Sequence, residues 1–441
     1  MPSDARVCAY AVLRRVFEDG AYADQALQAQ ARGLDARNRA LAMRIAYGAV
    51  QRRGTLDHLI ELLAQRPVRR LDAPLLAALR LGLYELLYLR GAPDHAVVAD
   101  AVELAKSGAR GGHGLVNAVL RRATREGTDL LDGLSDETPE RAAVKHSHPE
   151  WIARLWWEEL GAEQARALMA YDNEPGEVAL RANTLVTDAP TLAGELPVRT
   201  HPDADIPEAL VLEGPFDMHV SSAWRQGAFI AQSRAAMLVS RVLAPVPGET
   251  VLDLCAAPGG KTTHLAALMD GTGQVVAVER DRRRAGALLR TAQRLHAHNV
   301  RVELADAGLL RPEGAVFDRV LVDPPCSGLG TLQARPDLRW RMEPSRLGEL
   351  KRTQASILAA GAAAVRPGGV LVYSTCTISP TENERRIAAF LHANPDFALD
   401  DLSIELPALR HPSPHAPETV LTLPHRDRTA GFYIARLRRE D

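Results

Sequence analysis

The sequence predicts an α/β protein with a doubly wound, mostly parallel sheet, preceded by an all-helical region and a small α+β module. Beyond residue 249, strand-like apolar runs alternate with helical stretches, which is typical of βαβ units. Up to residue 130, apolar residues recur at three- and four-residue spacing without strand-like alternation. The stretch between mixes short elements of both kinds. We therefore predict three domains, at 1–130, 131–245 and 246–441.

In the helical domain, the segment 73–89 is apolar almost all round, as expected of a helix buried among other helices. Pro74 suits its first turn, and Asp35 and Asp72 are candidate N-caps. In the middle module we expect helices at 151–160 and 163–171 and a strand at 178–183.

The C-terminal domain contains the alternation that defines the sheet. Its last run, 431–437, is expected to add an antiparallel edge strand. The other expected strands are 251–255, 274–279, 300–305, 319–323 and 369–375, and the helices are 261–269, 282–297 and 345–365.

The bulk composition is that of a globular protein, with 46% hydrophobic and 24% charged residues among 441. No apolar run reaches the roughly 20 residues that span a bilayer, and the N-terminus lacks a signal-peptide pattern, so we expect no membrane association. The four cysteines form neither a disulfide framework nor a zinc pattern. We therefore expect free thiols, no bound metal and a cytoplasmic location.

The charge pattern leaves nucleic-acid binding open. The formal net charge is −2, but nearly all positive charge is arginine, which binds phosphates bidentately and stacks on bases. A GC-rich genome explains the same bias. Residues 1–130 carry a small excess of basic side chains, which permits an RNA surface.

The first strand of the sheet leads into a loop of small residues where ligands bind in doubly wound folds. The loop lacks the glycine patterns of dinucleotide sites and P-loops, which indicates a ligand without a phosphate chain. Glu279 and Asp306 each end a further strand, where carboxylates reach the ribose and the adenine amine. Together these features predict S-adenosylmethionine; the alternative is a structural turn and two surface acids. The candidate cofactor-binding residues are Cys255, Ala256, Ala257, Pro258, Gly259, Gly260, Lys261, Glu279, Asp306 and Asp323.

Two of the four cysteines, Cys326 and Cys376, end the next two strands, so both thiols are expected at the cofactor edge. A thiolate that adds to C6 of cytosine makes C5 nucleophilic enough to attack the sulfonium methyl group. One thiol would attack and the other would assist breakdown of the adduct, while Asp323 holds the base and helps to protonate N3. The alternative is that both cysteines are small buried hydrophobes.

The motifs CAAPGGKT (255–262), DPPCSG (323–328) and STCT (374–377) resemble those of RNA 5-methylcytosine methyltransferases. The resemblance implies that Cys376 is the nucleophile and that Cys326 helps to release the product. It also implies that residues 255–261, Glu279, Asp306 and Asp323 hold the cofactor. Glu279 stands where Asp is more usual.

The helical domain resembles the antitermination factor NusB at 35–42, 53–60 and 114–122. This architecture is similar to that of the RsmB/Sun family of 16S rRNA cytosine-C5 methyltransferases. The resemblance implies a monomer that binds small-subunit ribosomal RNA. The rival interpretations are methylation of transfer RNA or DNA, and a NusB-like RNA-binding factor with an inactive methyltransferase domain.

Two further segments have less specific sequences. Trp340 is expected to pack in a core rather than to stack on a base, whereas Arg335 is a candidate for substrate contact. The segment 380–384 resembles a family element that follows the nucleophile, and a plain helix start explains it equally well.

Overall fold

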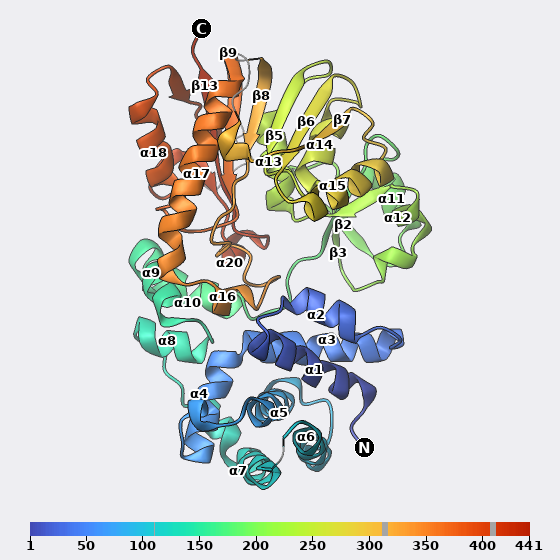
Figure 1. Ribbon diagram of the computed structural model, residues 1–441, viewed down its shortest axis with the longest axis vertical. Helices are drawn as coiled ribbons and strands as arrows, with labels where there is room; N and C mark the ends of the chain where they lie inside the picture. Colours follow the sequence, from blue (N-terminus) through green and yellow to red (C-terminus); the bar gives the residue numbers. More distant parts are fainter. Residues whose placement is uncertain (110, 311–315, 406–411) are drawn as a thin grey trace. The chain divides into compact units, whose positions relative to one another are not determined.

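The computed structural model describes residues 1–109, 111–310, 316–405 and 412–441 (Figure 1). By packing, the chain divides into two compact units, Met1–Pro175 with Leu332–Met342, and Gly176–Thr331 with Glu343–Asp441. The domain boundaries placed at 130 and 245 stay predictions. Within the described residues, no helix is both long enough and apolar enough to cross a bilayer.

The first unit is helical, as the periodicity of its apolar residues predicts. Asp35 caps α3, since its Oδ1 accepts a hydrogen bond from the Asn38 N–H at 2.8 Å. Asp72 occupies the N-cap position of α5 but makes no capping hydrogen bond through its side chain. The helices are α1 Asp4–Glu18, α2 Ala23–Gln30, α3 Ala36–Gln51, α4 Arg53–Ala64, α5 Ala73–Tyr84, α6 Asp94–Gly108, α7 His113–Asp132, α8 Pro139–Lys145, α9 Glu150–Leu160, α10 Ala162–Tyr171 and α16 Leu338–Arg341, with 3-10 turn η1 Val68–Arg70 and π-helical turn η2 Glu85–Leu89.

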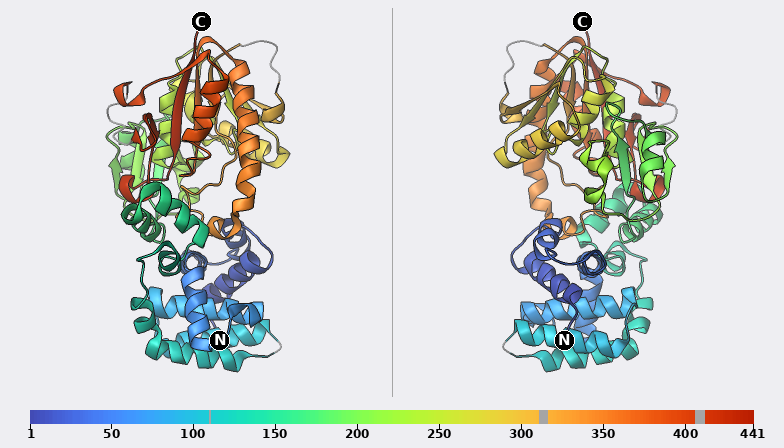
Figure 2. Two further views of the ribbon diagram at one scale, coloured as in Figure 1. Left: turned by 90° about the vertical axis from the view of Figure 1, so that its left-hand side faces the viewer. Right: turned by 90° about the vertical axis from the view of Figure 1, so that its right-hand side faces the viewer.

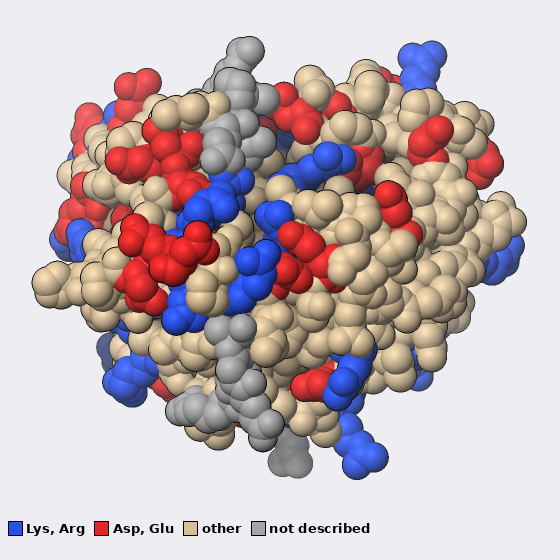
Figure 3. All heavy atoms as spheres, turned by 90° about the horizontal axis from the view of Figure 1, so that it is seen from above, with Lys and Arg blue, Asp and Glu red and all other residues tan. Residues whose placement is uncertain are grey.

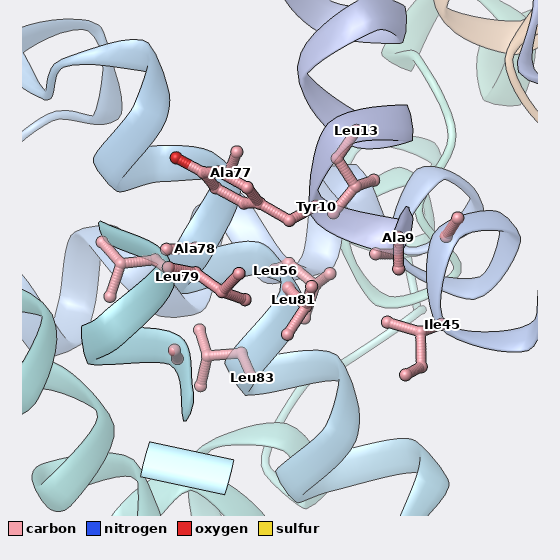
Figure 4. Packing of buried hydrophobic residues seen from close by; sticks show 14 of the residues in the cluster. Ala9, Tyr10, Leu13, Ile45, Leu56, Ala77, Ala78, Leu79, Leu81 and Leu83 are labelled. Carbon is pink, nitrogen blue, oxygen red and sulfur yellow. The ribbon is translucent and has the colours of Figure 1, made fainter. Parts of the chain in front are cut away.

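The core of this unit forms where α1, α3, α4 and α5 meet (Figure 4). Leu13, Ile45, Leu56 and Leu79 are all fully buried there. The predicted helix at 73–89 is α5, but its last turn is the π-helical η2. A carboxylate is buried in that turn because Glu85 pairs with Arg6 at 2.7 Å.

The segment Leu332–Met342 belongs to the first unit, although it follows the Cys326 loop in the chain. Trp340 packs against the core of this unit and donates its indole N–H to the Val50 carbonyl at 2.7 Å, which confirms the expected packing role. Arg339 is fully buried and donates to several backbone carbonyls of the unit. Arg335 is exposed.

The second unit contains the predicted doubly wound sheet, with helices on both faces (Figures 1 and 2). The order of its central strands is β9-β8-β5-β6-β7, and all four of these pairings are parallel. The carboxyl ends of these strands therefore meet at one edge. The strands are β5 Thr250–Leu254, β6 Gln274–Glu279, β7 Val300–Leu304, β8 Phe317–Val322, β9 Val365–Thr375, β10 Phe397–Leu399, β11 Pro412–Ser413, β12 Ala416–Leu421 and β13 Tyr433–Arg439.

The last strand, β13, is antiparallel to β9 as predicted, but the prediction of an edge strand is wrong. Its other side pairs with β12 and with β10, both of them antiparallel. These strands escaped prediction because β10 is only three residues long and β12 contains Pro417 and Glu418, which weaken a strand pattern. The helices of the second unit are α11 Ala189–Glu195, α12 Ser222–Arg225, α13 Arg234–Leu243, α14 Gly260–Leu268, α15 Arg282–Arg294, α17 Pro344–Ala364, α18 Glu384–Ala393, α19 Leu402–Glu405 and α20 Pro424–Asp427, with 3-10 turns η3 Met218–Val220 and η4 Ala307–Leu309.

A smaller antiparallel sheet in the same unit has the order β2-β3-β1-β4. Its first strand, β1, corresponds to the predicted strand at 178–183 and carries the buried Arg181, and the buried Asn183 directly follows it. The strands are β1 Ala179–Ala182, β2 Thr200–Pro202, β3 Ala209–Leu212 and β4 Phe229–Ala231.

The face of the second unit at which β13 ends carries the amino ends of the parallel strands, because β13 runs opposite to β9. Acidic and basic side chains are interspersed over this face (Figure 3). Near the starts of the strands, acidic and basic side chains form ion pairs. Arg366 pairs with Asp318 at 2.8 Å, and Arg319 pairs with Glu249 at 2.6 Å. The face is therefore a solvated surface of mixed charge. The predicted site residues lie at the opposite edge of the sheet, where the parallel strands have their carboxyl ends.

Candidate active site

The loop after β5 is shaped by residues in left-handed conformations. Cys255 has φ +66° and Gly259 has φ +102°. A Cβ atom at Gly259 would lie 2.6 Å from Leu288, so only glycine fits there. Thr262 ties the following helix to the strand, since its hydroxyl donates to Oδ2 of Asp253 at 2.6 Å. The loop can therefore bring its backbone close to a ligand.

A cavity of about 350 Å³ opens beside this loop. Cys255, Glu279 and Asp306 line it, as do Arg284 from α15 and Ser356 from α17. Three predicted cofactor-binding residues from three different strand ends are thus brought together. The other loop residues, and Asp323, are not part of its lining.

Glu279 offers this cavity an unused acceptor. The residue is only 3% exposed, and Oε1 accepts the N–H of Asp281 at 2.9 Å. Oε2 is buried without a hydrogen bond and lies 3.5 Å from Nη1 of Arg284. A buried carboxylate oxygen without a donor suits the hydroxyl groups of a ribose. Asp306 is exposed at the cavity, with Oδ1 accepting the Gly308 N–H at 2.9 Å. The residues therefore fit an adenosine group.

The two predicted thiols meet. Sγ of Cys326, after β8, lies 3.3 Å from Sγ of Cys376, after β9. Neither cysteine is in a disulfide, and both are partly exposed. The hydrogen bond to Cys376, together with burial, raises the pKa of Cys326 well above its usual range. Burial, with the charges of Asp323, Asp253 and Glu279, raises the pKa of Cys255 to about 12, which keeps that third thiol protonated.

A cation lies beside the thiol pair. Burial would lower the pKa of Lys261, but the negative charges of Asp323 and Cys376 outweigh it and raise that pKa. Lys261 Nζ lies 2.6 Å from Oδ2 of Asp323 and 4.9 Å from the ring centre of Phe432. Asp323 Oδ1 also accepts the hydroxyl of Ser374 at 3.2 Å. Lys261 and Asp323 thus lie at the thiol end of the site.

Sequence reasoning missed several residues that shape the site. Arg181 is fully buried and donates to the Gly260 carbonyl at 2.5 Å and to the Thr263 hydroxyl at 2.9 Å, which fixes the start of α14. Glu382, in the segment 380–384, is fully buried and hydrogen-bonded to Ser327 in the Cys326 loop. The segment also begins a helix, since α18 starts at Glu384. In the described part of the chain, His, Cys, Asp and Glu side chains form no cluster suited to a metal ion.

Comparison with known proteins shows the family to which the chain belongs. Residues 240–438 match the family of 16S rRNA methyltransferases RsmB/F. The probable ribosomal RNA small subunit methyltransferase B of Synechocystis is 36% identical, with 99% of each chain covered. The chain belongs to the RsmB/F family of 16S rRNA methyltransferases. S-adenosylmethionine is the cofactor of these enzymes and of this chain.

Other relatives agree. Residues 3–125 match the NusB family, and residues 148–219 match the ferredoxin-like domain of RsmF/B-like methyltransferases. The probable ribosomal RNA small subunit methyltransferase B of Bacillus subtilis is 33% identical, again with 99% of each chain covered. A crystal structure of a methyltransferase homologue from Pyrococcus horikoshii superimposes with a TM-score of 0.61 at 26% identity, covering 69% of this chain and 99% of that one. The predicted fold class and the predicted NusB-like part are thereby confirmed.

Proposed function

We propose that this enzyme methylates C5 of a cytosine in 16S rRNA through a transient covalent bond between Cys376 and C6 of the base. The observation that carries the proposal is the 3.3 Å separation of the Cys326 and Cys376 sulfurs. Pro325, next to Cys326, lines the cavity that fits adenosine, so the thiols lie beside the cofactor site. Two thiols at this separation can both reach one pyrimidine ring.

The charges around the two sulfurs favour Cys376 as the nucleophile. Asp323 is the main cause that raises the pKa of Lys261 and the Cys376 sulfur adds to it, so the Lys261 ammonium attracts negative charge on that sulfur. Cys326 stays protonated until Cys376 has reacted, since the hydrogen bond to Cys376 is the largest cause of the raised pKa of Cys326. Once the Cys376 sulfur is bonded to carbon, that cause disappears and Cys326 becomes able to lose its proton.

The reaction follows from these protonation states. The Cys376 thiolate forms a bond to C6 while N3 takes up a proton from solvent, and Asp323 orients the base edge at which this occurs. Bound S-adenosylmethionine supplies the methyl group that C5 takes up. Cys326, after releasing its own proton to solvent, removes the C5 proton as a thiolate. The electrons of the C5–H bond re-form the C5–C6 double bond, the sulfur–C6 bond breaks to regenerate the Cys376 thiolate, and N3 returns its proton to solvent. Each thiol acts once, in order.

We assign the cofactor to the loop after β5 and to the acids at the ends of the next strands. Glu279 would bind the ribose and Asp306 the adenine amine. Lys261 and Asp323 would face both the methyl group and the base. The loop residues concerned are Cys255, Ala256, Ala257, Pro258, Gly259, Gly260 and Lys261.

The RNA partner follows from the relatives, whose names specify ribosomal RNA of the small subunit. We infer that the NusB-like part binds this RNA and that the enzyme works as a monomer where ribosomes are assembled, in the cytoplasm. The target cytosine must be unpaired or flipped out of a helix, because C6 is inaccessible to a thiol within a stacked duplex.

Labelled cofactor, with separate ribosomal and transfer RNA pools, tests the proposal. Cys376→Ser should lose methyl transfer while keeping cofactor affinity, and Cys326→Ser should accumulate a covalent protein–RNA adduct. Cys8→Ala, in α1 of the first unit, is the matched control and should behave as wild type. Turnover by Cys376→Ser at the wild-type rate would refute the assignment of Cys376 as the nucleophile. If only the transfer RNA pool is labelled, transfer RNA is the substrate. If neither pool is labelled, the methyltransferase domain is inactive.

A further inference from the structure

Behind the two cysteines lies a buried hydrogen-bond network centred on Glu382. The Glu382 side chain is fully buried. Its Oε1 accepts the Ser327 N–H at 2.9 Å and Nε2 of Gln354 at 2.8 Å, and its Oε2 accepts the Ser327 hydroxyl at 2.5 Å. All three donors are uncharged. Gln354 also donates to the Pro325 carbonyl at 3.1 Å, so the carboxylate holds the residues on both sides of Cys326.

The same network reaches the second cysteine loop. Oγ of Ser327 lies 2.6 Å from Oγ1 of Thr377, the residue after Cys376. Because the Ser327 proton is directed to Glu382, the Thr377 hydroxyl must donate to Ser327. One carboxylate thus orders two hydroxyls in series, and these hydroxyls belong to the neighbours of the two thiols.

The neighbouring Asn383 completes the support of the Cys376 loop. Its Nδ2 donates to the Thr377 carbonyl at 2.9 Å, and its Oδ1 accepts the Thr375 hydroxyl at 2.6 Å. Asn383 therefore bonds the residues on either side of Cys376. Side chains of two adjacent residues, Glu382 and Asn383, hold both loops in place.

We propose that Glu382 is a positioning residue that fixes the two thiols side by side and, through its negative charge, keeps Cys326 protonated until Cys376 has reacted. Its charge is among the causes of the raised pKa of Cys326, after the hydrogen bond to Cys376 and burial. Asp323 is a further and smaller cause of that raised pKa, and it is paired with Lys261, which interacts with Cys376. The claim that Cys376 reacts before Cys326 rests on the proposed function. The claim that the charge of Glu382 favours the protonated thiol of Cys326 does not.

The effect on the thiol can be measured without RNA. We would follow alkylation of Cys326 by iodoacetamide from pH 6 to 10 in the full chain carrying Cys376→Ala, with peptide mass spectrometry to separate the remaining cysteines. Adding Glu382→Gln should move the midpoint of the pH profile down by about one unit, which is about tenfold in the acid constant. Greater exposure of Cys326 would also lower the midpoint, because burial contributes to the raised pKa, but it would in addition raise the plateau rate at high pH, which loss of the Glu382 charge alone leaves unchanged.

The matched control is Glu384→Gln, because Glu384 is also buried at the start of α18 but bonds Ser413 instead of the cysteine loops. It should leave the midpoint unchanged. Ser327→Ala keeps the charge of Glu382 and breaks the link to Thr377, so it should leave the midpoint in place and lower kcat for methyl transfer while KM for the cofactor stays constant.

An unchanged midpoint with Glu382→Gln, or an equal shift with Glu384→Gln, would overturn the role of the charge. Wild-type kcat with Ser327→Ala would overturn the role of the network in positioning. Failure of the wild-type enzyme to methylate RNA would count against the proposed function alone, since the alkylation profile does not depend on it. If Glu382→Gln does not fold, Glu382→Asp, which keeps the charge and shortens its reach, should keep the midpoint and lower kcat; a lowered midpoint there would overturn the proposal.

Discussion

Arg339 is expected to be the side chain on which the first unit depends most. It is fully buried, and its guanidinium donates to the carbonyls of Ser147 at 3.0 Å, Asp172 at 3.1 Å and Leu332 at 3.3 Å. It also donates to Oδ1 of Asn173 at 3.0 Å. Replacement by Met keeps most of the volume but leaves these acceptors buried without donors, and each such acceptor costs about 1–3 kcal/mol. Since the acceptors can relax and admit water, we expect Arg339→Met to lower the free energy of unfolding by roughly 3–5 kcal/mol.

The loss of unfolding free energy in Arg339→Met should depend on pH, and the ionisation of Asp172 determines whether it grows or shrinks as the pH rises. Burial raises the pKa of Asp172 to about 7, against the opposing charge of Arg339. A folded-state pKa above the unfolded value means that stability is greatest when the carboxyl is protonated and falls as the pH rises toward 7. Without the guanidinium the pKa of Asp172 rises further, so the fall continues to higher pH. The gap between wild type and variant should therefore widen from pH 5 to pH 9.

Urea denaturation followed by tryptophan fluorescence measures this gap, because Trp151, Trp156, Trp157 and Trp340 lie in the first unit and only Trp224 lies in the second. Arg335→Met, at an exposed position four residues earlier, is the matched control and should unfold as wild type does. An Arg339→Met midpoint equal to that of wild type, or a gap that narrows with rising pH, would refute this reasoning.

Three further predictions concern the second unit. Gly259→Ala places a Cβ 2.6 Å from Leu288 at φ +102° and should weaken S-adenosylmethionine binding about tenfold or more in calorimetry; unchanged affinity would mean that the loop is not part of the site. Glu279→Gln removes the charge from the unused acceptor and should weaken the same binding by about 1.5–3 kcal/mol, whereas an effect on kcat alone would count against ribose binding. Burial raises the pKa of Asp253 to about 7, so wild-type stability should fall between about pH 4 and 7, and Asp253→Asn should flatten that fall in urea denaturation; a parallel pH profile would contradict the assignment.

The sequence alone predicted the elements whose signal is local. The run 274–279 is observed as β6 with the same bounds, because buried parallel strands are continuous apolar runs. The helix expected at 282–297 ends at Arg294, since His296 adopts φ +56°. The strand β12 was missed because it is stabilised by pairing with β13 and not by an apolar pattern of its own.

The site divides in the same way. The two thiols could be placed together from sequence because each follows a strand and parallel strands share one carboxyl edge. Arg181 and Glu382 could not, because their partners lie far along the chain and a polar residue in a short strand or before a helix is usually exposed. Only the fold shows that these two polar side chains are buried.

The return of residues 332–342 to the first unit has a practical consequence for dissecting this enzyme. A fragment that stops at Pro175 would lack Arg339 and Trp340, and the carbonyls that they satisfy would be left to water. Fusing the amino-terminal unit to another protein therefore requires residues 332–342 as well, added either as a separate peptide or through a new covalent linker.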